Sequence, residues 1–578
     1  MTHAANRGRE PAPRPADFAD MFTPKLVTVL REGYSFANFR ADAIAGLTVA
    51  IVALPLSMAI AIGSGAKPEH GLIASVVAGF IISALGGSRF QIGGPAGAFI
   101  VLVAAIIAQH GYQGFLVATI MGGVIMLALG YLRLGTYIKY IPHPVTVGFT
   151  AGIAVIIFAG EIKDFFGLRL ESEPSALLAK FPALYAAAHT INWHATAIAL
   201  ACLAIILVLR RIAPRFPGLL AAVAVGAIVT WAFGLPVETI GTKFGGIPRT
   251  LPAPGLPDIS VSQIFQLIPA AIAIAVLGSI ESLLSAVVAD GMTGRRHRSN
   301  CELVAQGWAN IASALFGGMC ATGTIARTAT NVRARAHGPI AGILHAVFLL
   351  AFMFLAAPLA AWIPLAALAA VLAVVAYDMI EKEHFVAILR TSRGEATVLL
   401  ATFLVTIFRD LTEGIAVGVV LGSILFMHRM AELVEVTTGE SILDEDRADE
   451  ATADRTAYEP QIGGDIVVYR IAGPFFFGAA SQVSLVLEQI GAPPKAYVLD
   501  LSGVPLADQT AAQTILIFAK KAKRHGARVM IAGARRDVIR ILMRAGLDRS
   551  IVDYASNVTE ARNKFARRQA IEMTPVTA

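Results

Sequence analysis

The stretch Ala321-Thr322-Gly323-Thr324-Ile325-Ala326-Arg327-Thr328 decides how this chain is built. It lies between long apolar runs, yet it contains a glycine, three threonines and an arginine. An arginine inside a bilayer costs free energy unless it has a partner or a task. A second polar interruption, Gln91 to Gly97, breaks the apolar sequence in the same way. Two broken segments in matching halves of a chain indicate a transport site near the middle of a membrane.

The composition is that of a membrane protein with a polar tail. Hydrophobic residues make up 56% of the 578 residues and charged residues only 15%, whereas soluble domains carry about 25% charged residues. Apolar runs recur between Ala43 and Phe426, and each is long enough to cross a hydrocarbon core about 30 Å thick. Basic loops on one side of the membrane explain the net charge of +7 without a nucleic-acid partner. The polar first 40 residues do not resemble a signal peptide, so the first span would direct insertion.

The apolar pattern predicts a polytopic α-helical membrane domain of fourteen spans. The third and tenth spans are too short to cross alone, and we interpret them as half-helices that begin inside the membrane. The spans are expected at 43–64, 70–86, 95–109, 114–132, 144–160, 194–212, 217–233, 267–289, 301–317, 324–333, 338–357, 362–380, 394–408 and 411–428.

The loop charges predict the orientation of these spans. With fourteen spans, both termini lie on one side, and the loops on that side carry most of the arginine and lysine residues, among them Arg133, Arg295 and Arg390. The short loops on the other side contain little beyond Lys67 and Arg409. Because basic loops stay inside, both termini are predicted to be cytoplasmic.

A weak internal repeat divides the spans into two halves of seven. Ser83-Ala84-Leu85-Gly86-Gly87 ends the second span and Ser313-Ala314-Leu315-Phe316-Gly317-Gly318 ends the ninth, and a broken segment follows each. An odd number of spans per half makes the repeat inverted. Spans one, three, eight and ten are therefore expected to meet at the midplane.

The domain boundaries follow from changes in composition. We expect a cytoplasmic N-terminal segment (1–40) with an amphipathic helix at 21–40, the membrane domain (41–430), an acidic, loop-like linker (431–457) and a tail (569–578). Between them, residues 458–568 alternate strand and helix patterns, which predicts a small cytoplasmic α/β domain. Its expected elements are strands at 465–471, 496–501 and 528–532, and helices at 480–490, 510–525, 536–545 and 558–567.

The two broken segments are predicted to form an anion site. The helix N-termini at Ala96 and Thr324 would present free amides, and Arg327 would add a positive charge. Glycines allow the backbone to approach a ligand, and Pro95 suits the first position of a helix. A tight helix crossing is the alternative, but packing does not explain an arginine. The expected anion-site residues are Ser57, Gly94, Pro95, Ala96, Gly97, Thr324, Ile325, Ala326, Arg327 and Thr328.

Glu281 is the candidate for the coupling ion. It lies in the middle of an otherwise apolar span, where a carboxylate should be protonated, paired or bound to a cation. Ser285 lies one helical turn further on the same face and could share a sodium ion. The alternative is a structural ion pair between Glu281 and Arg327.

Beyond a proton or sodium ion, no cofactor or metal is predicted, because Cys202, Cys301 and Cys320 lack the spacing of metal ligands. The sequence also contains no catalytic triad and no phosphate loop, so the chain is not expected to be an enzyme.

Several stretches resemble the sulfate permease family of anion transporters, which carry a cytoplasmic STAS domain. The matching stretches are Ala53 to Ala59, Gly86 to Arg89 with Gly94-Pro95, Tyr140 to Pro142 with Val147 to Thr150, Glu281 to Leu284 with Asp290 to Gly294, Ile325 to Ala329 with Asn331, and Val498 to Pro505 with Asp508. The resemblance implies a seven-plus-seven inverted repeat with the anion between half-helices three and ten. It places Glu281 and Ser285 at the coupling-ion position, and it implies a homodimer.

Two positions depart from the common family pattern. Leu56 stands where many members have glutamine, and Ala96 where many have threonine. The chain looks most like the bacterial branch that imports C4-dicarboxylates such as succinate, with sulfate or bicarbonate transport as the alternative. This resemblance also implies a bacterial inner membrane. In related STAS domains a Ser or Thr at the position of Thr510 is phosphorylated; a docking role toward a soluble partner is the other interpretation.

The leading hypothesis is therefore proton-coupled uptake of dicarboxylates by an elevator-type movement of spans one to four and eight to eleven. An uncoupled anion channel or exchanger is a second hypothesis, which predicts flux without a cation gradient. A membrane sensor that signals through the STAS domain is a third, which predicts negligible flux.

Overall fold

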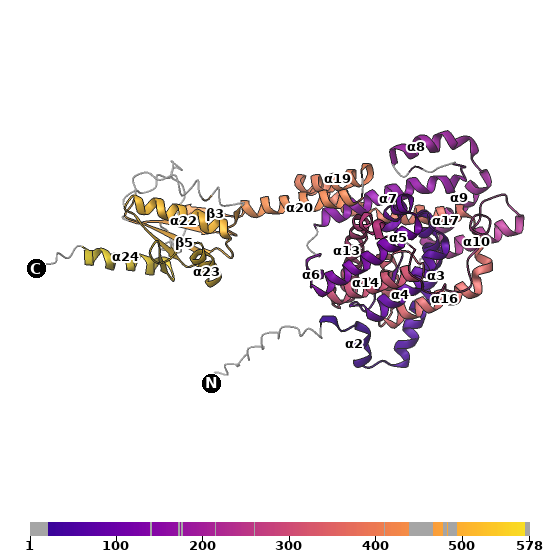
Figure 1. The fold of residues 1–578 in the computed structure, drawn as a ribbon, viewed down its shortest axis with the longest axis horizontal. Helices are drawn as coiled ribbons and strands as arrows, with labels where there is room; N and C mark the ends of the chain where they lie inside the picture. The colour runs from indigo at the N-terminus through magenta and orange to yellow at the C-terminus, as the bar shows by residue number, and fades with distance from the viewer. Residues whose placement is uncertain are drawn as a thin grey trace, which may run out of the picture. The chain divides into compact units, whose positions relative to one another are not determined.

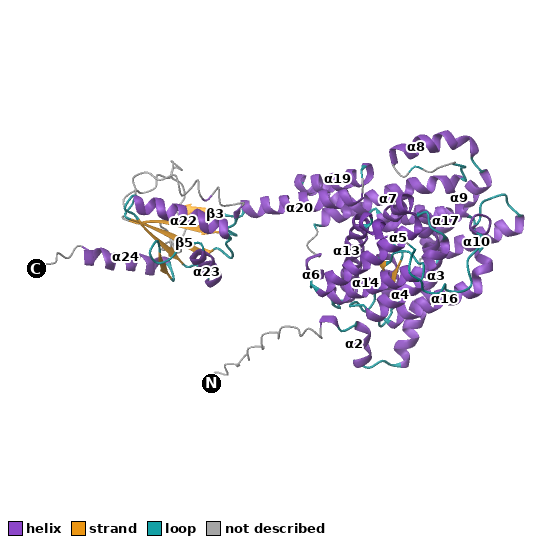
Figure 2. Ribbon diagram, in the orientation of Figure 1, coloured by secondary structure: helices purple, strands orange, loops and turns teal. Residues whose placement is uncertain are grey.

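The computed structural model describes residues 21–138, 142–170, 174, 177–213, 216–258, 261–409, 411–438, 466–477, 483 and 494–572. The chain divides into two compact units, 1–422 and 423–578. The first is a helical bundle that encloses two very short strands, and the second is built on a sheet (Figures 1 and 2).

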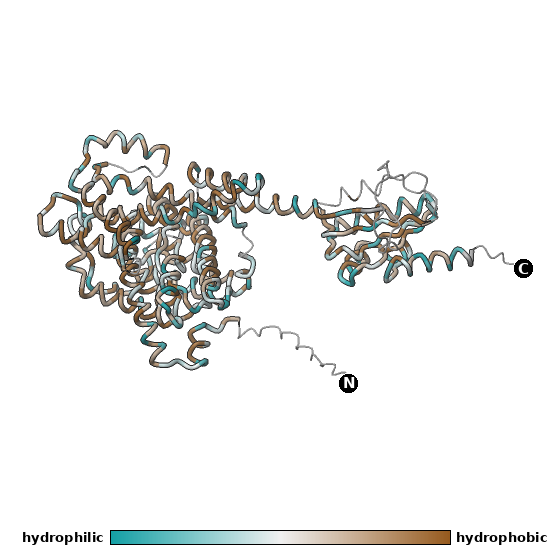
Figure 3. Tube along the Cα trace, turned by 180° about the vertical axis from the view of Figure 1, so that it is seen from behind, coloured by the Kyte–Doolittle hydropathy of each residue, from teal (hydrophilic) through white to brown (hydrophobic). Residues whose placement is uncertain are grey.

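The helical unit contains long apolar helices joined by short ones, and apolar residues dominate the long helices (Figure 3). Its elements are α2 (Lys25–Arg31), α3 (Phe36–Gly63), α4 (Pro68–Leu85), β1 (Gly93–Gly94), η1 (Gly97–Phe99), α5 (Ile100–Tyr131), α6 (Gly135–Ile138), α7 (His143–Phe166), α8 (Leu177–Ala186), η2 (Ala187–Thr190), α9 (Trp193–Ile212), α10 (Gly218–Phe233), α11 (Ile240–Phe244), α12 (Val261–Gln266), α13 (Ile268–Thr293), α14 (Ser299–Leu315), β2 (Thr322–Gly323), α15 (Ile325–Arg333), α16 (Ile340–Ala360), α17 (Leu365–Met379), α18 (Lys382–Thr391), α19 (Arg393–Phe408) and α20 (Leu411–Glu432).

Each predicted span coincides with a helical segment. Among the described residues, eight helices are long and apolar enough to cross a membrane: α3, α4, α5 with η1, α7, α9, α13, α16 and α20. The remaining predicted spans coincide with α10, α14, α15, α17 and α19, which are shorter or more polar. The third and fourth predicted spans are joined within α5 and are separated only by Gly111, whose φ of 69° interrupts the helix.

The helices pack in two groups. The most extensive contacts of the first group join α14 with α5, α16 with α3, and α13 with α5. Those of the second group join α17 with α7, α19 with α7, and α10 with α9. The first group contains predicted spans one to four and eight to eleven. The second contains spans five to seven and twelve to fourteen, with α18 packed on α7 and α19, and α3 also contacts α17 and α10 of this group.

The N-terminal helix expected at 21–40 is interrupted. The chain forms α2 only over Lys25–Arg31 and passes through Gly33, whose φ is 95°. Helix α3 then begins at Phe36, with Ser35 as its N-cap: the Ser35 hydroxyl accepts a hydrogen bond from the Asn38 amide. Glycine and serine thus end one helix and start the next, because both favour helix boundaries.

The second unit is a five-stranded sheet with helices on its faces. Strands β3 to β7 lie in chain order across the sheet; β3 pairs antiparallel with β4, and the other neighbours are parallel. Strand β5 carries six consecutive buried residues because both of its faces are covered, as parallel sheets require. The elements are β3 (Glu435–Thr438), β4 (Ile466–Ala472), β5 (Ala496–Gly503), α22 (Gln509–Arg524), β6 (Arg528–Ala532), α23 (Arg536–Arg544), β7 (Asp553–Ala555) and α24 (Val558–Glu572).

Most predicted elements of this unit are present, with two differences. Strand β3 lies within the segment expected to be a loop-like linker, and β7 was not predicted at all. Both are short edge strands whose pairing, rather than their own pattern, defines them. The helix expected at 480–490 falls almost entirely outside the described residues.

Candidate functional site

The two polar interruptions meet inside the helical unit. Strand β1 pairs antiparallel with β2, with Gly93 opposite Gly323 and Gly94 opposite Thr322. The amide of Thr324 extends this pairing by donating to the carbonyl of Ile92 at 3.0 Å. These buried backbone groups therefore satisfy each other where no helix could supply partners.

The side chain of Gln91 crosses β2 at Gly323, and only glycine leaves room for it there. A Cβ on Gly323 would lie 1.3 Å from Nε2 of Gln91, so no other residue fits there in this arrangement. Gln91 passes over this point to donate to the hydroxyl of Ser282 at 2.8 Å. The close approach of the two interruptions thus depends on the missing side chain.

Arg327 lies on α15 and is only 1% exposed. Its Nη1 donates to Ser75 at 3.1 Å, and its Nη2 donates to the Ser57 hydroxyl at 3.1 Å and the Pro95 carbonyl at 3.2 Å. All three partners are neutral, and no carboxylate of a described residue lies within ion-pair distance of Arg327. The guanidinium therefore places an uncompensated positive charge between α3, α4 and the β1 interruption.

Two helix N-termini flank this charge. Helix α15 begins after Thr324, and the η1–α5 helix begins after Ala96. No described acceptor receives a hydrogen bond from the amides of Ile325, Ala326 or Arg327. Ile325 is 37% exposed and Gly97 is partly exposed, whereas Ala96 is buried. Free amides at a helix start carry partial positive charge and favour a bound anion.

The sequence suggests that Pro95 is the first residue of a helix, but in the structure it lies before the helix. The helix begins two residues later, at Gly97. The carbonyl of Pro95 instead accepts a hydrogen bond from Arg327. Its role is thus to hold the guanidinium next to the start of the helix.

The hydroxyl groups of the threonines stabilise the backbone around the site. Thr324 Oγ1 lies 3.4 Å from the Ile92 carbonyl, and Thr328 Oγ1 accepts from the Ile92 amide at 3.1 Å. Ser285 of α13 bonds to the same Thr328 hydroxyl at 3.1 Å. Ser285 is therefore linked to the half-helix that carries Arg327.

Glu281 of α13 makes no ion pair with Arg327, so the structural pair considered from the sequence is wrong for this conformation. One of its carboxylate oxygens, Oε2, is buried and has no hydrogen-bond partner among the described residues. A buried acceptor without a donor is costly unless a proton or cation supplies the partner. The group is thus suited to bind either one.

Several polar residues behind the site were not singled out from the sequence. Glu302 is fully buried and accepts from the Gly87 amide at 2.9 Å, the Ser88 amide at 3.1 Å and Gln306 at 3.0 Å. Asn310 clamps Ala321, accepting from its amide at 2.9 Å and donating to its carbonyl at 2.8 Å. The four-residue spacing of Glu302, Gln306 and Asn310 along α14 places them on one face of the helix, but the same pattern is typical of a solvent-facing side.

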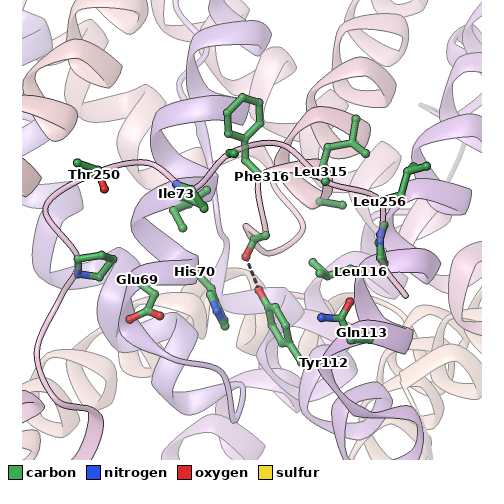
Figure 4. A pocket seen from close by; sticks show the side chains of 17 residues that line it. Glu69, His70, Ile73, Tyr112, Gln113, Leu116, Thr250, Leu256, Leu315 and Phe316 are labelled. Atoms are coloured by element: carbon green, nitrogen blue, oxygen red, sulfur yellow. Dashed lines mark hydrogen bonds between the residues drawn. The ribbon is translucent and has the colours of Figure 1, made fainter. Parts of the chain in front are cut away.

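A separate cavity of about 550 Å³ lies where α4 begins and α14 ends. Glu69, His70 and Tyr112 line one wall, and the proline-rich segment from Pro248 to Pro257 lines another (Figure 4). The Tyr112 hydroxyl donates to the Gly317 carbonyl at 2.9 Å, and its ring stacks on His70 at 4.0 Å. Gly317 precedes β2, so the cavity adjoins the chain that leads to β2 and Arg327.

Thr510 is exposed in the first turn of α22. The side chain of Asp508 caps this helix by accepting from the Ala511 amide at 2.8 Å. Thr510 lies in the second unit, separate from the residues around Arg327.

Two helix N-termini joined by a short strand pair inside a multi-pass helical bundle are typical of membrane transporters. Comparison with known families agrees. The sulfate permease family matches residues 39–402 and the STAS domain matches residues 457–561. The chain belongs to the sulfate permease family, whose members are transporters and not enzymes.

Relatives cover nearly the whole chain. YvdB of Bacillus subtilis, which is named as a candidate sulfate transporter, is 39% identical over 519 residues, covering 89% of this chain and 95% of that protein. The bicarbonate transporter BicA of Synechocystis is 30% identical over 550 residues, covering 93% of this chain and 96% of that protein.

Solved structures share the fold. The inward-facing structure of murine solute carrier 26 family member A9, an anion transporter, superposes with a TM-score of 0.81 at 17% identity, covering 98% of this chain and 97% of that one. The transmembrane domain of a cyanobacterial BicA gives a TM-score of 0.60 at 31% identity, covering 66% of this chain and 98% of that one.

Proposed function

We propose that this chain takes up a small inorganic oxyanion, with sulfate and bicarbonate as the first candidates. The observation that carries the proposal is the position of Arg327 beside two helix N-termini that β1 and β2 hold together. The names of YvdB and BicA support the substrate class. Neither relative is named for dicarboxylates, so C4-dicarboxylate uptake, which the sequence suggested, stays a prediction and enters the test as a third substrate.

The anion would lie between Gly97 and the free amides of Ile325 and Ala326, with Arg327 as the source of long-range attraction. Each of the other proposed site residues has a different role in positioning the arginine or the helix N-termini. Ser57 and Pro95 orient the guanidinium, Gly94 leaves room for it, Ala96 and Gly97 start one helix, and Thr324 and Thr328 hold the start of the other. Backbone amides and one arginine recognise negative charge without a specific shape.

Glu281 would couple uptake to a proton or sodium ion. Its unpartnered carboxylate oxygen lies on α13, and Ser285 on the same helix contacts Thr328 of the half-helix. A cation bound at Glu281 would therefore be connected to the element that carries Arg327. The first group of helices would carry both sites together in an elevator-type movement against the second group.

Reconstituted uptake tests this proposal. Proteoliposomes are loaded and assayed with labelled sulfate, bicarbonate or succinate, each under a proton gradient, a sodium gradient or neither. We expect one of the two inorganic anions to accumulate, and Glu281→Gln to abolish accumulation under the coupling gradient. Uptake of succinate alone would restore the dicarboxylate prediction. Flux that ignores both gradients would support an uncoupled channel or exchanger, and absence of flux with every substrate would favour a sensor.

The cellular setting is proposed from the same reasoning. Loop charges support a cytoplasmic position for both termini, and a bacterial relative supports a bacterial inner membrane, where the STAS domain would meet a second copy of the chain or a soluble partner. Thr510 is accessible for phosphorylation in that domain. Phosphoproteomic detection of Thr510 and crosslinking of intact membranes would test these points.

A further inference from the structure

His143, Glu381 and His384 lie together on the helical unit, on elements other than those that carry Arg327 and Gly97. His143 is the first residue of α7, Glu381 is the N-cap of α18, and His384 is in the first turn of α18. One ligand atom from each of the three residues lies within 4.8 Å of the other two. Nδ1 of His384 is 2.8 Å from Oε2 of Glu381, and the two imidazole centroids are 5.4 Å apart.

These distances suit a transition metal after a small contraction. Zinc bonds of about 2.0–2.1 Å in tetrahedral geometry put ligand atoms roughly 3.3 Å apart. Two imidazoles and one carboxylate favour Zn²⁺, Co²⁺ or Ni²⁺ over Mg²⁺ and Ca²⁺, which prefer oxygen-only sets. All three side chains are exposed, so water can reach the fourth position.

The packing beneath the three residues holds their helices in place. Val147 of α7, Ile388 of α18 and Leu399 of α19 form a buried apolar cluster, with Phe385 packed against it. Val147 is four positions from His143, and Phe385 and Ile388 are one and four positions from His384, while Leu399 comes from the adjoining helix α19. Ligands supported by a packed interface keep their separation and lose less entropy when a metal binds.

The side chain of Lys382, the nearest cation in sequence, points toward Tyr377. Lys382 lies between Glu381 and His384 in sequence, but its Nζ is 3.6 Å from the centroid of the Tyr377 ring. The ammonium group is thus held by a cation–π contact. It does not occupy the space between the two imidazoles and the carboxylate.

We propose that His143, Glu381 and His384 bind one divalent transition metal ion of the zinc type, with water at the open position. The metal fastens the start of α7 to the start of α18. Both helices belong to the second group, so the metal braces that group and is independent of the anion chemistry at Arg327. His143 is 238 positions before Glu381 and 241 positions before His384 in the sequence, which explains why no short sequence motif marks the site.

Metal binding by the intact, purified, tag-free protein tests the proposal. Co²⁺ is the spectroscopic probe because tetrahedral Co²⁺ absorbs strongly in the visible range, and calorimetry with Zn²⁺ measures affinity. We expect one equivalent to bind, and His143→Ala and His384→Ala each to weaken binding by about tenfold or more. Zn²⁺ should also raise the Tm of the wild type and not of these variants.

His428→Ala is the matched control. His428 pairs with Glu432 at 3.3 Å, an exposed histidine–carboxylate pair with no second imidazole in the group. This variant should bind the metal as tightly as the wild type. Glu381→Gln, which keeps the size of the side chain, guards against misfolding and should also weaken binding. Equal Co²⁺ spectra and Zn²⁺ affinities in wild type, His143→Ala and His384→Ala would overturn the proposal.

Discussion

Gly94 of β1 lies directly against Arg327 of α15: a Cβ added to Gly94 would be 2.2 Å from Nη1 of Arg327. Real side chains do not tolerate such an approach, so the guanidinium occupies space that only glycine leaves open. This contact joins the two interruptions of the bundle at the charge that is proposed to attract the anion.

Gly94→Ala should therefore displace Arg327 and weaken anion binding by about tenfold or more, since a hydrogen bond from a charged group contributes about 1.5–3 kcal/mol. The measurement is the Kd of the transported anion for purified protein. Gly291→Ala is the control, because a Cβ on Gly291 in α13 would meet nothing within 4 Å. An unchanged Kd in Gly94→Ala would contradict the proposed position of the charge.

Arg327→Lys should weaken anion binding as well, although the charge is kept. The guanidinium contacts Ser57, Ser75 and Pro95 at once, and a lysine ammonium is a compact point charge that cannot reproduce this fork. We expect a loss of about tenfold, from one lost charged hydrogen bond. Arg333→Lys, an exposed change in the same helix, should bind as the wild type does. Equal affinities of the two variants would show that charge alone matters.

The sequence was sufficient to predict the meeting of the two interruptions. Arg327 stands in an apolar context, where only tertiary structure can compensate the charge, and the glycines around Gly94 mark the second break. The paired strands themselves could not be predicted, because two residues each are too few to show an alternating pattern. The contact between Gly94 and Arg327 likewise depends on side-chain packing across 233 positions (327 minus 94).

The burial of the polar residues of α14 could not be predicted from the sequence. Glu302, Gln306 and Asn310 follow the spacing of a polar helix face, and that pattern is typical of a solvent-facing side. In the structure this face is buried against the segment between α4 and β1 and against Ala321, which precedes β2. A single sequence does not distinguish a solvated polar face from a buried hydrogen-bond network, because both satisfy their polar groups.

Asn310→Ala should destabilise the protein. Asn310 supplies both hydrogen bonds to the buried Ala321, and its removal leaves an amide and a carbonyl unpaired. Each unsatisfied buried group costs about 1–3 kcal/mol. A lower Tm in detergent, together with weaker anion binding because Ala321 leads into β2, is the expected result. A Tm equal to that of the wild type would show that water replaces the side chain.

Asp508→Ala should loosen the start of α22 in the STAS domain. Asp508 accepts from the Ala511 amide at 2.8 Å and from the Phe477 amide at 2.9 Å, so it caps the helix and also holds the segment after β4. Loss of an N-cap aspartate costs about 0.5–2 kcal/mol, which should appear as faster hydrogen exchange at Thr510 and Ala511 in the intact protein. Asp537→Ala is the control, because Asp537 pairs with the exposed Arg535 and makes no cap to the α23 backbone. Exchange that accelerates equally in α22 of both variants would mean that general charge loss, and not the cap, controls this helix.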